Sequence, residues 1–277
     1  MNKNKKSILI TGCSSGIGLC VAQGLQKRGY RVFASARKQD DVNKLNEMGL
    51  ESLQLDLDDS NSIKNAFNHI LEKTGGTLDA LFNNGAYGQS GAVEDLSRDV
   101  LRQQFETNVF GWHELTNLVL PVMLKQGHGR IIQNSSVLGF VALKFRGAYN
   151  ASKYAIEGLT DTLRQELIGT NVYISLVEPG PIESCFRKNA FAMYKKNINK
   201  DKSRFKTAYQ ATEARLSKKG PAVPFTLPPE AVLKKVILAL ESTKPKPRYY
   251  VTFPTYLFGY LKRFLSARLM DKILNKV

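Results

Sequence analysis

The sequence predicts an α/β fold in which a doubly wound parallel sheet of about seven strands forms a single domain. The chain has 277 residues, 43% of them hydrophobic, which is enough to bury a full core. Short strand-like runs alternate with helical patterns, and no long linker or internal repeat interrupts them. Parallel strands joined by such crossovers wind right-handedly, and helices cover both faces of the sheet.

The elements are read from apolar runs and helical patterns in chain order. Strands are predicted at residues 7–11, 31–36, 52–56, 79–83, 130–135, 173–178 and 248–253. Helices are predicted between them, at residues 17–28, 61–74, 99–126, 150–169 and 229–241. Short apolar runs are typical of buried strands, and longer amphipathic stretches are typical of helices.

The first strand leads into a glycine-rich turn and then an amphipathic helix that runs to Arg28. Gly12 permits the tight turn, Gly16 lets the backbone approach a pyrophosphate, and Gly18 allows close packing of the helix. The start of the helix also offers unpaired N–H groups to phosphates. A glycine-rich turn alone is equally typical of an ordinary loop, but a strand before it and a helix after it favour a dinucleotide site.

The fifth strand leaves Ser136 at its carboxyl end, the edge at which open parallel sheets bind ligands. A serine in this position is more often only a turn-former. Thirteen residues later, Tyr149 and Lys153 are four positions apart, so one helical turn places an ammonium beside a phenol. A nearby cation favours the phenolate and lowers a phenol pKa that is normally about 10. The lysine can therefore allow the tyrosine to act as an acid and a base near neutral pH. The alternative is an unrelated Tyr and Lys on a surface helix.

These motifs together resemble the short-chain dehydrogenase/reductase family, in its single-domain branch with a Gly-x-x-x-Gly-x-Gly turn and a Tyr-x-x-x-Lys pair. The likeness covers about residues 5 to 184 and includes Asn108 within Thr-Asn-Val-Phe-Gly, as well as Pro179 and Gly180 after the sixth strand. The resemblance implies a Rossmann fold that binds a nicotinamide cofactor.

The resemblance also implies a catalytic set of four residues. Ser136 would bind and polarise the substrate carbonyl, and Tyr149 would pass the proton. Lys153 would hold the nicotinamide ribose and lower the tyrosine pKa, and Asn108 would position a water in a proton relay. The implied cofactor contacts are Gly12, Ser14, Ser15, Gly16, Ile17, Gly18, Arg37, Lys38, Asp56, Leu57, Asn84, Gly85, Tyr149, Lys153, Pro179, Gly180, Ile182 and Ser184.

Two positions depart from the family pattern. The family usually has Asn-Asn-Ala-Gly after the fourth strand, whereas this chain has Asn83, Asn84, Gly85 and Ala86, which puts a methyl where the family has bare backbone. Ser184 stands where the family often has Thr, which keeps the hydroxyl that would reach the nicotinamide carboxamide.

The end of the second strand bears on the choice of cofactor. A site selective for NAD would place Asp or Glu about 20 residues beyond the glycines to hold the ribose 2′-hydroxyl. Ala36 occupies that place and is followed by Arg37 and Lys38. An arginine can bind a 2′-phosphate through two parallel charge-assisted hydrogen bonds. The sequence therefore favours NADP(H), with NAD(H) as the alternative if both cations are merely solvated.

The net charge of +16 is concentrated late in the chain. Residues 183–220 hold eleven Lys or Arg and three acids. Residues 244–277 hold eight Lys or Arg and one acid. By the resemblance, about 183–225 would form a substrate lid. Its apolar side chains would line a pocket and Lys195, Lys196 and Lys200 would face water, although a solvated amphipathic helix fits as well. The pocket side chains would be Phe186, Ala190, Phe191, Met193 and Tyr194.

Residues 253–277 are predicted to be a basic amphipathic extension of a catalytic domain that covers residues 1–252. On a helix, one face would carry Leu257, Phe258, Leu261, Phe264 and Leu265. Lys262 and Arg263 are expected on the opposite face, which would suit a helix lying in a membrane surface. Packing on the domain or a contact between subunits are the alternatives.

Other features exclude whole classes of function. The three cysteines and three histidines show no metal-ligand spacing, so we expect no metal site and a reducing compartment. The basic segment Met1 to Lys6 lacks the apolar stretch of a signal peptide, and no run of about 18 apolar residues exists. We therefore expect a cytoplasmic protein, with the inner membrane surface as its one membrane contact. No groove-reading motif supports nucleic-acid binding.

The sequence thus predicts an NADP(H)-dependent oxidoreductase that interconverts an aldehyde or ketone and an alcohol on a small apolar substrate. The whole pattern looks like the bacterial NADP-dependent aldehyde reductases of the family, and also like its retinol and 17β-hydroxysteroid dehydrogenase branch. An NAD-dependent alcohol, retinol or hydroxysteroid dehydrogenase is the alternative, and a non-catalytic nicotinamide sensor is a third. The resemblance further implies a homodimer or homotetramer built through helices near 99–126 and 150–169.

Overall fold

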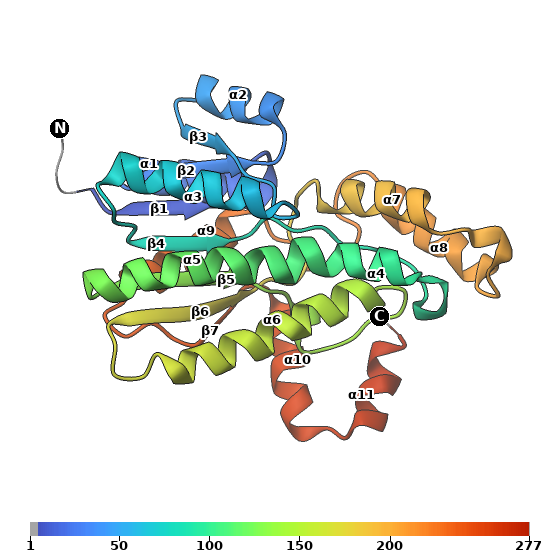
Figure 1. Cartoon of the computed structure of the whole chain (residues 1–277). Coiled ribbons are helices and arrows are strands. Elements are labelled where there is room, and N and C mark those ends of the chain that lie inside the picture. Colours follow the sequence, from blue (N-terminus) through green and yellow to red (C-terminus); the bar gives the residue numbers. More distant parts are fainter. Residues whose placement is uncertain (1–4, 277) are drawn as a thin grey trace.

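One parallel sheet of seven strands forms the centre of the molecule (Figure 1). The structure is a computed structural model that describes residues 5–276, so most of the basic segment Met1 to Lys6 lies outside the described residues. The strands run in the order β3-β2-β1-β4-β5-β6-β7. Their bounds are β1 Ser7–Ile10, β2 Arg31–Ala36, β3 Glu51–Gln54, β4 Ala80–Asn83, β5 Gly129–Asn134, β6 Val172–Glu178 and β7 Arg248–Tyr250. The predicted doubly wound sheet is confirmed.

Helices cover both faces of this sheet. Residues of α1 (Gly16–Lys27) and α9 (Glu230–Glu241) pack on one face, and residues of α3 (Ser60–Thr74), α5 (Gly111–Gln126) and α6 (Gly147–Glu166) pack on the other. Along β1, Ile8 and Ile10 enter the first core and Leu9 enters the second, as the alternation of side chains in a strand requires. Burial on both faces explains why the strands read as continuous apolar runs.

The predicted helix 99–126 is three elements. It consists of α4 (Arg98–Phe105), a π-helical turn η2 (Glu106–Phe110) and α5. Thr107, Asn108 and Val109 are poor helix formers, and Asn108 bonds to groups outside its own helix, so the regular ladder gives way here. Helix α2 (Gln39–Glu47) was not predicted, because only Val42 and Leu45 are buried in a short polar segment.

The two basic regions fold into helices that extend beyond the sheet (Figure 1). The lid contains α7 (Phe186–Asn197), the short turn η4 (Lys200–Lys202) and α8 (Lys206–Ser217). The C-terminal extension forms α10 (Phe253–Phe264) and α11 (Ala267–Leu274). Two further short turns, η1 (Val93–Asp95) and η3 (Val137–Gly139), lie at the same edge of the fold as the lid and α10.

The C-terminal extension packs on the domain through one face. Phe258 and Met270 are buried in a cluster with Leu138 and Val141, and Leu261 and Leu265 pack against the same cluster. Leu257 and Phe264, expected on this face, instead point to solvent. Lys262 was expected on the opposite face, but it donates to the backbone carbonyl of Phe140, because it follows Phe258 by one helical turn. Within residues 5–276, no helix is both long and apolar enough to cross a bilayer.

Candidate active site

The glycine turn lies where the order of strands reverses, between β1 and β4, which is the ligand crevice of doubly wound sheets. Gly12 has φ +71°, and a Cβ on it would lie 2.5 Å from the Cα of Gly85. A Cβ on Gly18 would lie 2.2 Å from the carbonyl oxygen of Gly12. Both positions therefore require glycine. Ser15 precedes α1 and makes no side-chain capping bond, which leaves the first N–H groups of the helix available for a phosphate.

Thr11, which the sequence analysis did not single out, holds this crevice together. Its hydroxyl accepts the backbone N–H groups of Asn84 and Gly85, both at 2.9 Å. The amide of Asn84 donates back to the Thr11 carbonyl at 2.9 Å and accepts from Asn134 at 2.9 Å. Thr11 is fully buried at the end of an apolar strand, and a polar side chain in that position is the signal that could have identified it.

The exchanged order of Gly85 and Ala86 has a packing reason. A Cβ on Gly85 would lie 3.1 Å from the Leu57 side chain and 3.2 Å from the backbone nitrogen of Gly12, so this position has little room for a side chain. Ala86, by contrast, packs against the apolar core. The chain therefore keeps bare backbone where the loop meets the glycine turn.

The adenosine end of the crevice carries the predicted basic pair. Ala36 is buried at the end of β2, and Arg37 and Lys38 are exposed directly beyond it. Asp56 lies two residues past the end of β3 and is half-buried. The charge of Arg37 opposes the rise that burial causes in the pKa of Asp58, so the guanidinium lies near that carboxyl group.

The predicted catalytic pair is brought together on the first two turns of α6. Lys153 is buried, and its Nζ lies 5.7 Å from the centroid of the Tyr149 ring. The same Nζ donates to the carbonyl oxygen of Asn134 at 2.8 Å and lies 4.3 Å from the centroid of the Trp112 ring. Ser136 follows β5, and its hydroxyl is near enough to the Tyr149 phenol to lower the pKa of that phenol by hydrogen bonding. Hydroxyl, phenol and amine therefore lie side by side at the carboxyl edge of the sheet.

Burial controls the proton affinity of both groups. It raises the pKa of Tyr149 to about 12, against smaller lowering effects of the Ser136 hydrogen bond and the Arg146 charge. It also lowers the pKa of Lys153 to about 7, against a raising effect of Glu157. The predicted fall in the Tyr149 pKa is therefore absent from this structure, because removing the phenol from water disfavours its anion more than its neighbours favour it.

Asn108 lies in the π-helical turn and joins two parts of the site. Its amide nitrogen donates to the Tyr87 carbonyl at 2.9 Å and to the Ser152 hydroxyl at 3.2 Å, and its oxygen accepts from the Tyr87 N–H at 3.1 Å. Ser152 in turn donates to the carbonyl of Tyr149 at 2.8 Å. Single π-helical turns often mark functional sites. Because both amide hydrogens bond to protein, the side chain is fixed in place between Tyr87 and Ser152.

The segment after β6 closes the opposite end of the crevice. Pro179 accepts a hydrogen bond from Val137 at 2.8 Å, and Gly180 packs against Thr252. Ile182 forms an isolated bridge with Leu227, and the Ser184 Cβ lies 2.9 Å from where a Cβ on Gly16 would be. This segment therefore brings Ser184 next to Gly16 of the glycine turn.

Only part of the lid faces this crevice. The Phe186 ring lies 5.2 Å from the Tyr149 ring between centroids, as a pocket wall would. Ala190 and Tyr194, predicted for the same wall, are instead buried with Tyr209 in a small core of the lid itself, and Phe191 packs against that core. The lid is therefore a small packed unit rather than a single helix lying over the substrate.

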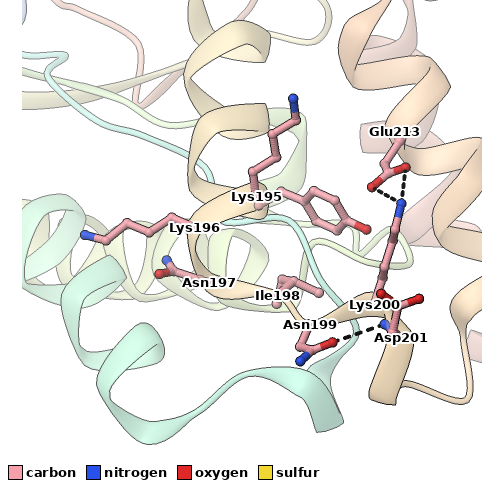
Figure 2. Close-up of a pocket in the computed structure, with 9 residues that line it drawn as sticks. Lys195, Lys196, Asn197, Ile198, Asn199, Lys200, Asp201 and Glu213 are labelled. Carbon is pink, nitrogen blue, oxygen red and sulfur yellow. Dashed lines mark hydrogen bonds and ion pairs between the residues drawn. The ribbon is translucent and has the colours of Figure 1, made fainter.

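A hollow of about 470 Å³ opens at the outer turn of the lid, between α7 and α8 (Figure 2). Lys195 and Lys196 are exposed there, as predicted, but Lys200 reaches Glu213 and bonds both of its carboxylate oxygens at 3.0 Å. None of the catalytic residues lines this hollow. The hollow is therefore separate from the predicted catalytic residues.

Three acids surround Arg248, and two of them belong to α6. Arg248 on β7 lies 3.1 Å from Glu157, 2.6 Å from Asp161 and 3.2 Å from Glu178. Glu178 is fully buried, and burial, followed by the charge of Glu157, raises its pKa to about 9. One carboxyl group of this cluster is therefore protonated at neutral pH.

This raised pKa predicts how stability depends on pH. The folded state binds the Glu178 proton more tightly than the unfolded chain does, so stability falls as pH rises from the unfolded pKa of about 4.3 towards the folded value. Glu178→Gln removes that titration. We expect the melting temperature of the variant relative to wild type to rise by roughly 10 degrees, about 3–4 kcal/mol, between pH 6 and pH 9, because each pH unit over which the folded state keeps the extra proton costs about 1.4 kcal/mol. Scanning calorimetry at both pH values tests this, with exposed Glu183→Gln as the control; parallel pH curves for Glu178→Gln and wild type would contradict it.

The chain is similar to known proteins over most of its length. Residues 6–195 match the family described as short chain dehydrogenase. The chain belongs to the short-chain dehydrogenase family. This short-chain dehydrogenase is 44% identical over 271 residues to the "Uncharacterized oxidoreductase YbbO" of Escherichia coli (strain K12), covering 98% of this chain and 94% of that relative.

Two further likenesses span nearly the whole chain. It is 32% identical to the "NADPH-dependent 3-dehydrocapnine reductase" of Ornithobacterium rhinotracheale over 277 residues, which cover 97% of this chain and 95% of the relative. A crystal structure of a short-chain dehydrogenase from Streptomyces avermitilis superposes with a TM-score of 0.77 at 25% identity, covering 99% of this chain and 97% of that one. The family likeness therefore includes the lid and the C-terminal helices.

Proposed function

We propose that this short-chain dehydrogenase is an NADP(H)-dependent oxidoreductase that interconverts an aldehyde or ketone and an alcohol on an apolar substrate, and that it works as an aldehyde reductase. The observation that carries the proposal is the meeting of Ser136, Tyr149 and Lys153 beside a glycine turn at the carboxyl edge of the sheet. A nicotinamide sensor without turnover would not require these proton-transfer groups.

The crevice fits a dinucleotide. Backbone would approach the phosphates at Gly12, Ser14, Ser15, Gly16, Ile17 and Gly18, where glycines and uncapped N–H groups leave room and hydrogen-bond donors. The Oδ1 atom of Asn134 is buried without a protein partner beside Lys153, as expected where a ligand group completes the bonding. When bound, the nicotinamide supplies or accepts a hydride.

The side chains of this chain would then manage charge and protons. The hydroxyls of Ser136 and Tyr149 would hydrogen-bond the substrate oxygen and stabilise the negative charge that develops on it. Tyr149 would donate its proton to that oxygen. A phenol with a raised pKa is protonated at neutral pH, which is the form that reduction needs. Lys153 would fix the nicotinamide ribose. Asn108 would position a water in the proton relay, while its side chain holds the loop at Tyr87 against α6.

The wall beside Tyr149 supports an apolar substrate. Tyr149 packs against the cluster that contains Leu138 and Val141, and Phe186 of the lid covers it from the other side. An aldehyde with a hydrocarbon body would bury its chain against these side chains. Oxidation of NADPH in the presence of a panel of aliphatic and aromatic aldehydes tests the proposal. Tight cofactor binding without turnover of any carbonyl would favour the sensor instead.

The preference for NADP(H) rests on the end of β2. Ala36 leaves no carboxylate to repel a 2′-phosphate, and Arg37 and Lys38 are exposed beside it. We expect Arg37→Asp to lower the ratio of kcat/KM for NADPH to that for NADH by about 10- to 100-fold, since it replaces charge-assisted bonds with repulsion. Lys27→Asp, which makes the same charge change at the far end of α1, is the control. An unchanged ratio would refute the role assigned to Arg37, and a wild-type ratio that favours NADH would favour the NAD-dependent alcohol, retinol or hydroxysteroid dehydrogenase.

We also propose that the outer face of α10 contacts a membrane surface that carries anionic lipids. This face exposes Phe253, Tyr256, Leu257, Tyr260 and Phe264, and the last of these is 82% exposed. The exposed cations Arg263 and Arg268 border it, which suits an anionic headgroup layer. The inner face of α10 packs in the same cluster as Tyr149. Removal of the C-terminal extension would therefore disturb the candidate active site as well.

Surface variants test this contact without removing the tail. We expect the double variant Tyr260→Ser, Phe264→Ser to sediment with anionic liposomes several-fold less than wild type, while neutral liposomes bind neither protein well. Ile168→Ser replaces an equally exposed apolar side chain, 78% exposed, beyond the end of α6, and serves as the control. Equal sedimentation of wild type and the double variant would remove the membrane contact.

We also propose a homodimer or homotetramer in which α4, α5 and α6 form the contact between subunits. Large apolar residues face solvent there, namely Leu101, Phe110, Leu124, Tyr154 and Leu159. Such a surface is more typical of a subunit contact than of an isolated monomer. Light scattering of the purified protein measures the state directly.

A further inference from the structure

Three arginines lie on the segment before α6 and on the two lid helices. Arg146 immediately precedes α6, Arg187 is the second residue of α7, and Arg215 lies in the last turn of α8. Arg187 donates to the backbone carbonyls of Lys218 and Gly220, directly after α8, and the ring of Phe145, beside Arg146, lies 5.7 Å from the ring of Tyr209 on α8. The three arginines are therefore gathered around α8. The charge of Arg215 lowers the pKa of Arg146, and the charge of Arg187 lowers that of Arg215. All three side chains are partly buried.

No carboxylate neutralises this cluster within the described part of the chain. The arginines that form ion pairs there are others, namely Arg28, Arg31, Arg102, Arg164, Arg204 and Arg248. The nearby acids of the lid are already engaged, Asp201 with Lys206 and Glu213 with Lys200. Arg187 donates only to the backbone carbonyls of Lys218 and Gly220.

Such an arrangement is costly for the protein alone. Burial and the neighbouring Arg215 lower the pKa of Arg146 to about 10, and burial and Arg187 lower that of Arg215. Partly desolvated cations that repel one another are normally paired with an acid, as Arg248 is. The missing partner of the cluster would therefore be an anion that comes from outside the chain.

The cluster lies next to the reacting atoms. Arg146 precedes Tyr149 by three residues, roughly 4.5 Å along a helix axis, and its charge reaches the phenol. Arg187 follows Phe186, whose ring covers Tyr149. A guanidinium group is planar and binds carboxylate, sulfonate or phosphate oxygens in pairs.

We propose that Arg146, Arg187 and Arg215 bind an anionic group carried by the same substrate whose carbonyl is reduced at Tyr149. The substrate class is then an amphiphilic carbonyl compound with an apolar body and an anionic group. This proposal rests on the proposed reductase function and adds a determinant of specificity to it.

Matched pairs of substrates separate the arginine site from the reductase function. The assay follows NADPH oxidation with straight-chain aldehydes that end in a carboxylate and with their methyl esters, over a series of chain lengths. We expect wild type to favour the best carboxylate over its ester by about tenfold or more in kcat/KM. Arg146→Gln and Arg215→Gln should each abolish most of that preference, mainly by raising KM for the carboxylate, and should leave the ester within about twofold. Arg146→Lys should recover part of the preference, and Lys188→Gln, an exposed cation next to Arg187, should change neither substrate.

The outcomes are distinguishable. Wild type that reduces esters and carboxylates equally at every length overturns the arginine site and leaves the reductase intact. Variants that slow both substrates alike assign the arginines a structural role and also overturn it. If no aldehyde turns over, the reductase fails, and a thermal shift with the saturated dicarboxylates still decides the site. A rise in melting temperature for wild type that is lost in Arg146→Gln supports it, and equal shifts in both proteins refute it.

Discussion

Tyr149→Phe is expected to lower kcat for carbonyl reduction by about 10³-fold while the affinity for NADPH changes less than about threefold. The variant removes the one hydroxyl that both hydrogen-bonds Ser136 and lies beside Lys153. The ring itself remains to pack against Phe186, so the pocket keeps its shape. Stopped-flow measurement of NADPH consumption and a fluorescence titration of cofactor binding give the two quantities.

Tyr154→Phe is the matched control for this experiment. Tyr154 lies on the same helix, but its side chain is largely exposed and Lys262 covers its ring. We expect it to retain wild-type turnover. If Tyr149→Phe kept more than about a tenth of the wild-type kcat, another group would have to supply the proton, and the assignment of Tyr149 would be wrong.

Gly18→Ala is expected to weaken cofactor binding by about 100-fold or more and to destabilise the protein. The new methyl would lie 2.2 Å from the Gly12 carbonyl oxygen and 2.7 Å from the Asn84 amide. The first of these is backbone, so the glycine turn and α1 must move apart, and the N–H groups that face the phosphates move with them. Cofactor titration and the melting temperature measure the two effects.

Gly158→Ala is the matched control, because it changes the same atoms inside a helix with open space around them. Apart from neighbouring atoms of its own helix, no heavy atom of the described residues lies within 4 Å of the Cβ that would be added there. We expect that variant to be stabilised by about 0.5–1 kcal/mol, since alanine favours helix, and to bind cofactor normally. Equal cofactor affinity in Gly18→Ala and Gly158→Ala would show that the turn does not need its glycine.

Contacts between residues that are close along the chain could be predicted from the sequence. Tyr149 and Lys153 meet because one helical turn joins them, and Gly12 and Gly18 meet because one tight turn does. Thr11 and Asn134 were missed because their importance arises from bonds to Asn84, which is distant in sequence. Such contacts become visible only when β1, β4 and β5 lie side by side.

Electrostatics and local irregularities were harder to predict. The pattern Tyr-x-x-x-Lys suggests a lowered phenol pKa, but the depth of burial, which sequence does not reveal, outweighs that effect. The π-helical turn at Asn108 was hidden because one extra residue in a turn hardly alters an apolar pattern over 28 positions. The position of Arg146 near Arg215 likewise depends on how α8 packs against Phe145, in the segment that precedes α6.

The packing of the last two helices gives the enzyme a way to diversify. Phe258 and Met270 belong to the same apolar cluster that Tyr149 touches, yet they lie at the end of the chain and carry none of the proton chemistry. Under the proposed function, substitutions in these helices would alter the apolar wall beside Tyr149 for a new hydrocarbon body without replacing a proton-transfer group. Specificity and reactivity would then be encoded in separable segments, and the final helices would be the natural place to graft or randomise when new substrates are sought.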